Sequence, residues 1–396
     1  MGQFTEKQNL FMRQALRLAR QGWGMVSPNP MVGAVLVKRG KVIAEGWHTG
    51  PGQPHAEADA IAKAGKRAEG SELYVNLEPC AHQGRTPPCA DAIIKAGISK
   101  VWYSIPDPNP RAKGGAGILR DAGLSVSQGL LEEEALELNQ FYIKHTLTGI
   151  PFVVLKTAAS LDGKIATSSG DSRWISSKVA RNFGHHLRAG VDAVMIGRTT
   201  AEKDDPELSA RPFGKRKMHR EPLRVVLDPT LRLPRDLKLF DRDFGGPTLV
   251  FCAEDAPDKE SKALEKLGHK VARVPRTPKG LLSLEAALAK LGKMGLQSVL
   301  IEPGATLAAS ALIEEKVADL VHVFIAPKFL GGQDSPSMIG GDGVANLADA
   351  PLQDIVKLGR KGPDLHLTIR PETAWTAVPL PDGTYGSKAS GTMGPG

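Results

Sequence analysis

Four side chains in the first quarter of the chain are of the types that a catalytic zinc ion requires. One residue separates His55 from Glu57, and eight residues separate Cys80 from Cys89. One imidazole and two thiolates can hold zinc in a tetrahedral shell whose fourth position stays open for water. Zinc lowers the pKa of such a water towards neutrality, so that hydroxide becomes available as a nucleophile at pH 7.

The order of these residues indicates which reaction the water would serve. Zinc-dependent base deaminases carry His-x-Glu followed by Pro-Cys-x-x-Cys, and their Glu moves protons without binding the metal. Pro79 precedes Cys80 here, and only the later arrival of Cys89 departs from that signature. The pattern predicts hydrolytic deamination. A closed structural zinc site remains an alternative, with His48 or His82 as its fourth ligand.

The first pair is placed by the start of a helix. Pro54 precedes His55, and residues 56–64 form a helical pattern, so His55 and Glu57 lie where the chain enters that helix. Positions i and i+2 do not share a helix face, so only at such an entry can both side chains reach one pocket.

The two cysteines follow a strand and open a second helix. Residues 71–77 form a β-rich run, and Cys80 comes just after it. Residues 88–96 form a helical pattern with Cys89 in its first turn. Amide dipoles at a helix N-terminus stabilise a thiolate, which favours metal binding by Cys89.

The composition limits the class of protein. A length of 396 residues suggests two domains, each with its own core. Three cysteines are too few for a disulfide framework, which fits a reducing cytoplasm. The N-terminus lacks the apolar run of a signal peptide, and no stretch of 18 apolar residues occurs. We therefore expect a soluble cytoplasmic protein that does not enter a membrane.

The charge indicates anionic ligands. The formal net charge is +8, aromatic residues make up only 5% of the chain, and the basic run at 215–220 is short. A nucleic-acid surface usually interleaves basic and aromatic side chains over a wider area. Small phosphorylated substrates therefore fit the charge better than nucleic acid.

The chain divides near Gly149-Ile150-Pro151. Before this joint, a strand hairpin over 32–45 is followed by alternating helices and strands, which is typical of a three-layer α/β domain over 1–149. After it, apolar runs alternate with helical patterns and predict a second α/β domain over 150–380. The Gly-, Ser- and Pro-rich tail over 381–396 is expected to be disordered.

The second half carries polar segments but no Gly-x-Gly-x-x-Gly after a strand, which argues against an ordinary Rossmann site. The segments lie at 156–164, 170–174 and 201–206. In addition, an apolar run at 298–301 leads into Glu302-Pro303-Gly304, a turn that opens a helix. Free amides at a helix N-terminus can hold phosphate. These features predict a phosphate- or nucleotide-binding α/β domain.

Taken together, the motifs resemble one enzyme family. Up to about residue 370 the chain is similar to the bifunctional pyrimidine deaminase/uracil reductases of riboflavin biosynthesis. The motifs that carry this resemblance lie at 27–33, 48–57, 78–89 and 107–110 in the first half and at 156–164, 170–175 and 204–206 in the second. The long spacing between the two cysteines separates the chain from cytidine and tRNA-adenosine deaminases.

The resemblance implies the fold and the cofactors. It implies an N-terminal three-layer domain like that of cytidine deaminases and a C-terminal α/β domain with the dihydrofolate reductase fold. It also implies one Zn²⁺ per chain and NADPH. Members of the family tend to form homo-oligomers through the reductase domain, so a dimer or tetramer is expected.

In the deaminase half, the resemblance implies that His55, Cys80 and Cys89 hold zinc. The activated water would attack the amino-bearing ring carbon of a diaminopyrimidine ribosyl phosphate. Glu57 would pass the water's proton to the ring nitrogen and to the departing ammonia. By the same resemblance, Asn29 would hold the pyrimidine and His82 would lie beside the substrate.

In the reductase half, NADPH would pass hydride to C1 of the ribosyl group and open the sugar to a ribityl chain. The positions that match NADPH contacts are Ala158, Trp174, Thr200, Asp204 and Gly304. The positions that match substrate contacts are Ser172, Arg188, Leu208, Arg211 and Glu302. Arg188 and Arg211 suit the 5′-phosphate because a guanidinium grips two phosphate oxygens at once. Lys156 would orient or protonate the opening sugar.

Two loops differ in sequence from what is usual in the family. The family reads Glu-Gly-Gly where this chain has Glu302-Pro303-Gly304, and the loop at 114–117 also varies. Proline lacks an amide N–H and fixes φ near −65°, where glycine is free. If that amide normally contacts the cofactor diphosphate, NADPH binding is weaker here, although reductase activity is expected to be retained.

Two other functions remain open at this point. A zinc deaminase acting on nucleic acid, such as a tRNA-editing enzyme, shares the first motif. The cysteine spacing and the large second domain without a basic-aromatic surface argue against it. A non-enzymatic chain with a structural zinc and a binding module is the other alternative.

Overall fold

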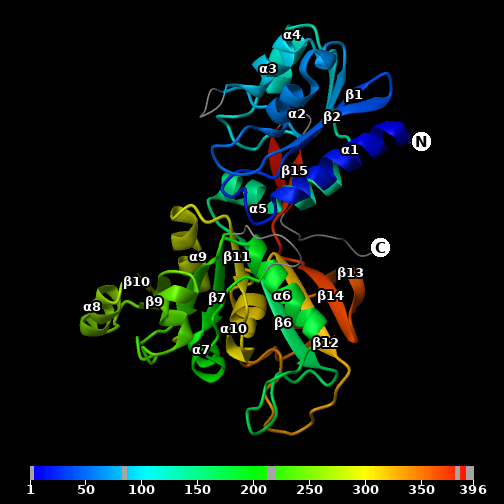
Figure 1. The fold of residues 1–396 in the computed structure, drawn as a ribbon. Coiled ribbons are helices and arrows are strands. Elements are labelled where there is room, and N and C mark those ends of the chain that lie inside the picture. Colours follow the sequence, from blue (N-terminus) through cyan, green and yellow to red (C-terminus); the bar gives the residue numbers. More distant parts are fainter. Residues whose placement is uncertain (1–3, 83–86, 212–219, 380–383, 389–396) are drawn as a thin grey trace. The chain divides into compact units, whose positions relative to one another are not determined.

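The computed structural model describes residues 4–82, 87–211, 220–379 and 384–388. The chain forms two units: residues up to Thr148 together with Ala377–Lys388, and Gly149–Thr376 (Figure 1). Outside the described residues lie 83–86 of the cysteine motif, 215–219 of the basic run, and 381–383 and 389–396 of the tail. Within the described part, no helix combines the length and the apolar character needed to cross a bilayer.

The first unit is built on a five-stranded sheet in the order β2-β1-β3-β4-β5. The strands are β1 (Gly33–Lys38), β2 (Lys41–Trp47), β3 (Glu72–Leu77), β4 (Lys100–Ile105) and β5 (Ser125–Gln128). The expected hairpin is confirmed, because β1 and β2 pair antiparallel across a tight turn. The β3–β4 and β4–β5 pairs are parallel.

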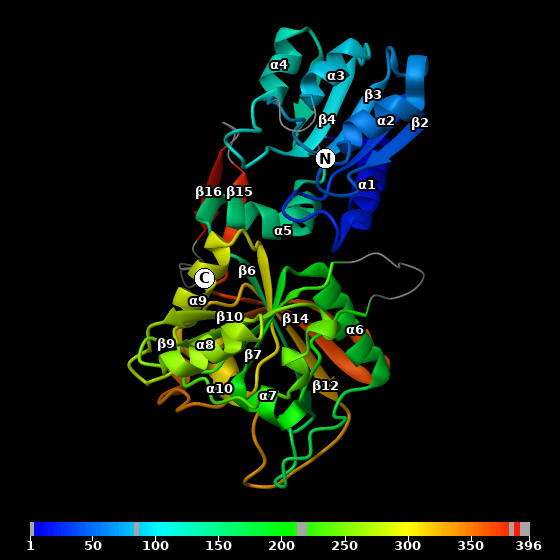
Figure 2. The ribbon, with the colours of Figure 1, turned by 60° about the vertical axis from the view of Figure 1, so that its left-hand side comes forward.

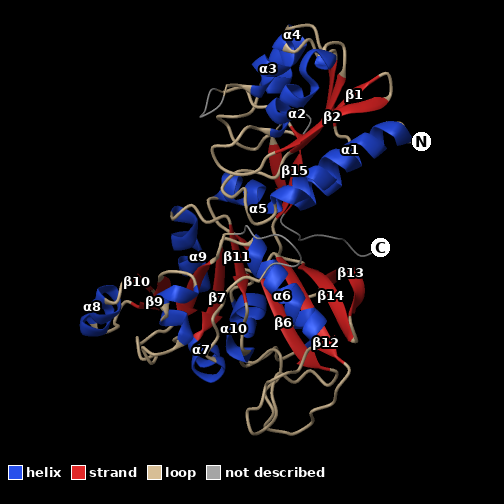
Figure 3. Cartoon of the chain, in the orientation of Figure 1, coloured by secondary structure: helices blue, strands red, loops and turns tan. Residues whose placement is uncertain are grey.

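Helices cover both faces of this sheet, which confirms the three-layer arrangement (Figure 3). On one side, α1 (Glu6–Ala19) packs against β1 and β3, and α5 (Glu132–Thr148) packs against β4. The other side carries α2 (Ala56–Ala64), α3 (Cys89–Lys95) and α4 (Gly115–Asp121). Thr5 and Gln8 form a capping box that starts α1, whose apolar stripe is buried against the sheet.

A small sheet near the C-terminus also belongs to the first unit. It pairs β15 (Thr376–Pro379) with β16 (Tyr385–Lys388), which lie side by side (Figure 2). The Tyr385 hydroxyl donates a hydrogen bond of 2.7 Å to the Pro106 carbonyl at the end of β4. The expectation of a disordered tail is therefore wrong for 385–388, because pairing with β15 and this hydrogen bond supply partners that the local composition does not reveal.

The second unit contains a nine-stranded sheet in the order β10-β9-β8-β7-β11-β6-β12-β14-β13. Its strands are β6 (Phe152–Ser160), β7 (Ala193–Gly197), β8 (Leu223–Leu227), β9 (Thr248–Ala253), β10 (Lys270–Val274), β11 (Ser298–Ile301), β12 (Leu320–Ala326), β13 (Gln353–Lys361) and β14 (Asp364–Pro371). The strands from β10 to β12 run parallel, whereas β14 and β13 are antiparallel to their neighbours.

Most consecutive parallel strands are joined by an α-helix, whereas β8 and β9 are joined by a long segment with two short turns. The helices of this unit are α6 (Lys178–Gly190), α7 (Arg198–Asp204), α8 (Asp258–Lys266), α9 (Leu284–Lys293) and α10 (Ala305–Ala309). Shorter turns occur in both units at Arg20–Gly22, Gly65–Ala68, Lys238–Phe240, Arg242–Phe244, Ser310–Glu314 and Leu347–Asp349. The central strands are almost fully buried, which explains their continuous apolar sequences.

Candidate functional site

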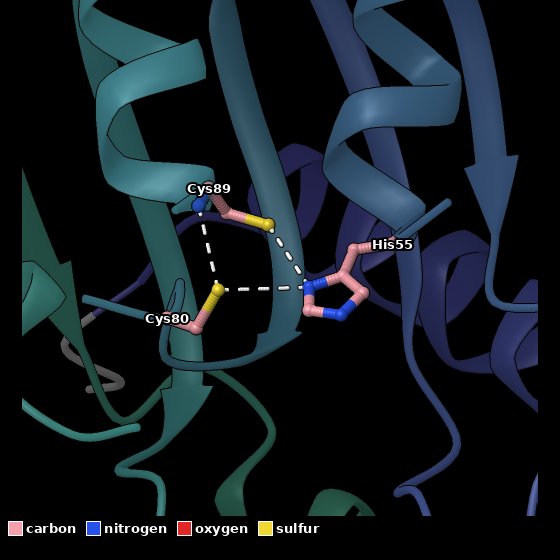
Figure 4. Close-up of side chains that lie close together, drawn as sticks. All are labelled: His55, Cys80 and Cys89. Carbon is pink, nitrogen blue, oxygen red and sulfur yellow. Dashed lines mark hydrogen bonds between the residues drawn. The ribbon is translucent and has the colours of Figure 1, made fainter. Parts of the chain in front are cut away.

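Three elements bring the predicted zinc ligands together in the first unit (Figure 4). His55 is the extended residue that caps the N-terminus of α2. Cys80 comes just after β3, and Cys89 is the first residue of α3. Because β3 lies centrally in the sheet and both helices pack on the same face, their starting residues converge at one point.

The spacing of the donor atoms fits a zinc ion. His55 Nδ1 lies 3.2 Å from Cys89 Sγ and 3.5 Å from Cys80 Sγ. The three ligand atoms all lie within 4.8 Å of one another. Zinc–nitrogen and zinc–sulfur bonds at tetrahedral angles separate N and S by about 3.6 Å. The side chains therefore need almost no rearrangement to hold the metal.

The charges around the cluster also favour a cation. The thiol of Cys89, the imidazole of His55 and the backbone amide of Cys89 all point at Cys80 Sγ, and together they hold the pKa of Cys80 well below its usual range. Glu57 is only 4% exposed, and burial raises its pKa to about 7, with a further contribution from the charge of Cys80. A carboxyl group whose pKa lies near neutrality can both accept and donate a proton.

The alternative of a closed site is not supported by the described residues. His48 Nδ1 lies 3.1 Å from the Pro54 carbonyl, which can only accept, so this nitrogen donates. His48 Nε2 is then the acceptor for the side-chain amide of Asn29, at 2.9 Å. Both ring nitrogens are used, and neither His48 nor the exposed His82 belongs to the metal-binding group. Among the described residues the metal-binding group therefore has three members.

Two buried amides that the sequence did not single out hold the loop of Asn29. Asn139 on α5 accepts from the Met31 amide and donates to the Met31 carbonyl, at 2.8 and 3.0 Å. Asn76 on β3 donates to the same carbonyl and accepts from the Gly33 amide, at 2.9 and 2.8 Å. Neither residue lies in a recognisable motif, so only their burial in the folded unit reveals this role.

Glu78 explains why a carboxylate precedes the first cysteine. Its two oxygens accept hydrogen bonds from the amides of Asp107, Gly114 and Ala116, at 3.0–3.3 Å. The side chain therefore ties the end of β3 to the loop after β4 and to the N-terminus of α4, where negative charge is favoured. This fixes the segment that presents Cys80.

The second unit contains a pocket of about 1160 Å³ at the carboxyl ends of adjacent parallel strands. Ligands of open parallel sheets bind in such crevices because the loops after neighbouring strands meet there. All of the reductase positions expected from the resemblance line it: Lys156, Ala158, Ser172, Trp174, Arg188, Thr200, Asp204, Leu208, Arg211, Glu302 and Gly304. The volume suits a dinucleotide together with a small substrate.

An ion pair crosses one wall of this pocket. Arg188 on α6 donates to both carboxylate oxygens of Glu302, at 2.6 and 2.8 Å, and to the Ser209 carbonyl at 3.2 Å. Burial alone would raise the pKa of Glu302, but Arg188 and Lys156 outweigh it and hold the pKa at about 2. Burial lowers the pKa of Lys156, whose ammonium group lies 5.7 Å from the centre of the Phe324 ring.

Other expected positions lie on more open parts of the pocket. Trp174 is 62% exposed, and the Arg181 guanidinium stacks over its ring at 4.3 Å. The Ser172 hydroxyl donates to the Asp204 carboxylate at 3.3 Å. Arg211 is exposed and pairs with Glu207 at 2.7 Å. Pro303 lines the pocket between the ion pair and the start of α10. The position at which this chain differs from the usual family sequence therefore lies at the site itself.

These two sites define the chain as a zinc-binding deaminase domain joined to a reductase domain. A family model for the zinc-binding region of cytidine and deoxycytidylate deaminases matches residues 5–105. A second family model, the RibD C-terminal domain, matches residues 151–367. The second match alone covers more than half of the chain.

The chain belongs to the RibD family of bifunctional deaminases and reductases of riboflavin biosynthesis. Riboflavin biosynthesis protein RibD of Bacillus amyloliquefaciens is 39% identical over 363 residues, covering 91% of this chain and 96% of the relative. RibD of Escherichia coli is 38% identical over 369 residues, covering 91% and 98%.

Solved structures agree over most of the chain. Acinetobacter baumannii RibD, form 1, is 37% identical with a TM-score of 0.82 over 92% of this chain and 99% of that one. The diaminohydroxyphosphoribosylaminopyrimidine deaminase/5-amino-6-(5-phosphoribosylamino)uracil reductase of Thermotoga maritima is 35% identical with a TM-score of 0.80 over 92% and 99%. The cofactors are Zn²⁺ in the deaminase domain and NADPH in the reductase domain.

Substitutions at two glycines of α4 test how closely this helix must approach the Pro79-Cys80 segment. A Cβ atom on Gly115 would lie 1.8 Å from the Pro79 carbonyl, whereas one on Gly117 would meet nothing within 4 Å. Gly115→Ala should lower the stability of the deaminase domain by about 1–3 kcal/mol, since it overpacks a tight contact. Gly117→Ala should raise it by up to about 1 kcal/mol through helix propensity.

Thermal unfolding of both variants, with bound zinc quantified in parallel, measures the difference. Equal melting temperatures for the two variants would contradict the close contact between α4 and the Pro79-Cys80 segment.

Proposed function

We propose that Glu57 is the proton carrier of the deaminase step. When bound at His55, Cys80 and Cys89, zinc supplies a water that is activated at neutral pH. Glu57 takes one proton from the water that attacks the amino-bearing carbon of the pyrimidine and passes it to the ring nitrogen. It then passes the second proton of that water, from the new hydroxyl group, to the amino group, which leaves as ammonia. The observation that carries this proposal is a buried carboxyl group next to three convergent zinc donors, to which the described residues add no fourth.

The substrate of this step is a phosphorylated diaminopyrimidine riboside. Asn29 holds the pyrimidine. The hydrogen bond to His48 orients the side-chain amide of Asn29 for this role. Because the NH2 group of Asn29 donates to His48, its side-chain oxygen can accept a hydrogen bond from an amino group of the pyrimidine ring. His82, which is exposed two residues after Cys80, lies beside the bound substrate.

In the reductase pocket, NADPH transfers hydride to C1 of the ribosyl group, and the sugar opens to a ribityl chain. The residues proposed to hold the cofactor are Ala158, Trp174, Thr200, Asp204 and Gly304. The residues proposed to hold the substrate are Lys156, Ser172, Arg188, Leu208, Arg211 and Glu302. Three N–H groups of Arg188 are already used within the protein, so Arg211 is the guanidinium more available to the 5′-phosphate. Deamination comes first, so NADPH is consumed only after ammonia has been released.

Glu57→Gln separates the two activities. The variant should retain one zinc per chain because Glu57 is not a ligand, while ammonia release falls by about 10²–10⁴-fold because the proton carrier is lost. Reduction of the deaminated substrate should be unchanged. Zinc content, ammonia release and NADPH oxidation are measured separately, with Glu69→Gln, an exposed carboxylate beyond α2, as the control. Undiminished ammonia release from the zinc-loaded variant would refute the assignment.

Pro303→Gly tests whether the missing amide weakens the cofactor site. We expect the KM for NADPH to fall by about 2- to 10-fold, which is the effect of one added hydrogen bond of about 0.5–1.5 kcal/mol. The control is Pro278→Gly at an exposed turn, because both changes loosen the unfolded chain to a similar degree. A KM equal to that of the parent enzyme would show that the family's second glycine contributes no cofactor contact.

We further propose that two or more copies of the chain associate through the reductase unit. Strand β13 is the edge of the nine-stranded sheet, and it exposes Ile355 by 54% and Leu358 by 66%. Edge strands with exposed apolar side chains are normally covered. In a symmetric dimer, the same strand of a second copy can cover β13, because the two surfaces are identical and self-complementary.

Light scattering during gel filtration measures the association. The double variant Ile355→Lys/Leu358→Lys should shift the enzyme towards the monomer. Leu267→Lys, an equally exposed leucine at the end of α8, should not. A monomeric parent enzyme, or a double variant of unchanged mass, would contradict the proposal.

The cytoplasm is the proposed location. Cys80, Cys89 and Cys252 are free thiols in the structure. A reducing compartment keeps such thiols available, and two of them must be reduced to bind zinc.

A further inference from the structure

The segment 160–164, with the sequence Ser-Leu-Asp-Gly-Lys, has no role in the function described above. It is the turn at which β6 ends, and it leads into a loop that supplies Ile165, Ala166, Ser172 and Trp174 to the reductase pocket. A second loop, which follows β12 and covers 327–340, runs beside it and supplies Pro336 to the same pocket. The lower part of Figure 1 shows the two loops together.

Asp162 joins the two loops through its carboxylate. One oxygen accepts from the Leu330 amide at 3.1 Å and the other from the Gly331 amide at 2.7 Å. The Ser160 hydroxyl donates to the same carboxylate at 2.5 Å and in turn accepts from the Lys164 amide at 2.9 Å. These donors, with the Ser160 hydroxyl first, lower the pKa of the exposed Asp162 carboxyl to about 2, because they stabilise its charged form.

Backbone and side-chain contacts extend the junction along both loops. The amides of Leu161, Ile165 and Met338 donate across it to the carbonyls of Lys328, Pro336 and Gly163, at 2.7, 3.0 and 2.9 Å. The ammonium group of Lys164 donates to the Ser335 carbonyl at 2.9 Å. The start of the first loop, over 161–165, is thus joined to residues 328–338 of the second, and both loops contribute to the lining of the pocket.

The junction also reaches the proposed cofactor contact. Lys328, which follows β12, donates from its ammonium group to the Trp174 carbonyl at 2.7 Å. Trp174 is largely exposed, and the Arg181 guanidinium lies over its ring at 4.3 Å. The hydrogen bond from Lys328 therefore couples the backbone position of Trp174 to that of the second loop.

We propose that Asp162 is a positioning residue of the reductase site, which fastens the 327–340 loop to the 160–175 loop so that the pocket wall carrying Ser172 and Trp174 is preformed for NADPH. The proposal rests on the proposed role of Trp174 in holding the cofactor. Asp162 itself is not among the residues that line the pocket, so it would act through the loops that it joins.

Asp162→Ala removes the two hydrogen bonds that the carboxylate accepts from the Leu330 and Gly331 amides. If the wall is then correctly formed in only about a tenth of the molecules, the apparent Kd and KM for NADPH rise about tenfold, since a partly populated competent state reduces apparent affinity by its fraction. The reductase kcat at saturating NADPH and the deaminase activity should stay within about twofold of the parent values. Asp162→Asn keeps one acceptor oxygen and should give an intermediate Kd.

The control is Asp334→Ala, which removes the same charge from an exposed position of the same loop and should leave the Kd for NADPH unchanged. Lys328→Met removes only the link to Trp174 and should raise the Kd in the same direction, so it decides the question if Asp162→Ala does not fold. NADPH fluorescence measures the Kd, steady-state kinetics separates KM from kcat, and thermal unfolding reports stability.

Three outcomes are informative. A lower melting temperature with an unchanged Kd for NADPH would overturn the positioning role and leave Asp162 as a structural residue only. A raised Kd in Asp162→Ala and Lys328→Met, with an unchanged Kd in Trp174→Ala, would support the positioning role while removing Trp174 from the cofactor contacts. A raised Kd in all three variants is the expected result.

Discussion

Parallel pairing of neighbouring strands is the constraint on which both sites depend. A parallel strand must be followed by a crossover to the opposite end of the sheet, so the carboxyl ends of all parallel strands meet at one edge. In the first unit this edge receives Cys80 after β3 and Asp107 after β4. In the second unit it receives Thr200 after β7 and Glu302 after β11. The chemistry of each half is therefore assembled from loops that are distant in sequence.

The backbone amides of loops at such an edge have few hydrogen-bond partners in regular secondary structure. Polar side chains make these hydrogen bonds instead. Glu78 collects three amides from the loop after β4 and from α4. Asn76 and Asn139 bind the backbone around Met31 from two different elements. Asp162 performs the same task for the second unit. Backbone groups left unpaired in such places would cost free energy, which is why these polar side chains can fix irregular segments.

The elements that the sequence predicted well are the buried ones. The apolar runs of β6, β7, β9 and β11 are continuous because both faces of these strands are covered, so they stand out in the sequence. In contrast, β13 is exposed along almost its whole length and has no clean alternation, because it is an edge strand with a register shift after Ile355. Strand β16 lies within the segment 381–396, for which the composition predicts disorder, because its partners are tertiary ones such as β15 and the Pro106 carbonyl.

The sequence alone determined the chemistry and the family, because the types and spacing of His55, Glu57, Cys80 and Cys89 are those of a zinc deaminase and further motifs cover the second half. Only the tertiary structure decided which neighbours these residues have. It engages both nitrogens of His48 away from the metal group, pairs Arg188 with Glu302, and joins Asp162 to a loop more than 160 residues further along the chain. Residue types and local spacing set what a side chain can do, whereas a hydrogen bond or ion pair requires two groups within about 3 Å of each other. For groups so far apart in sequence, that distance is fixed only when the sheets and their crossover helices have formed.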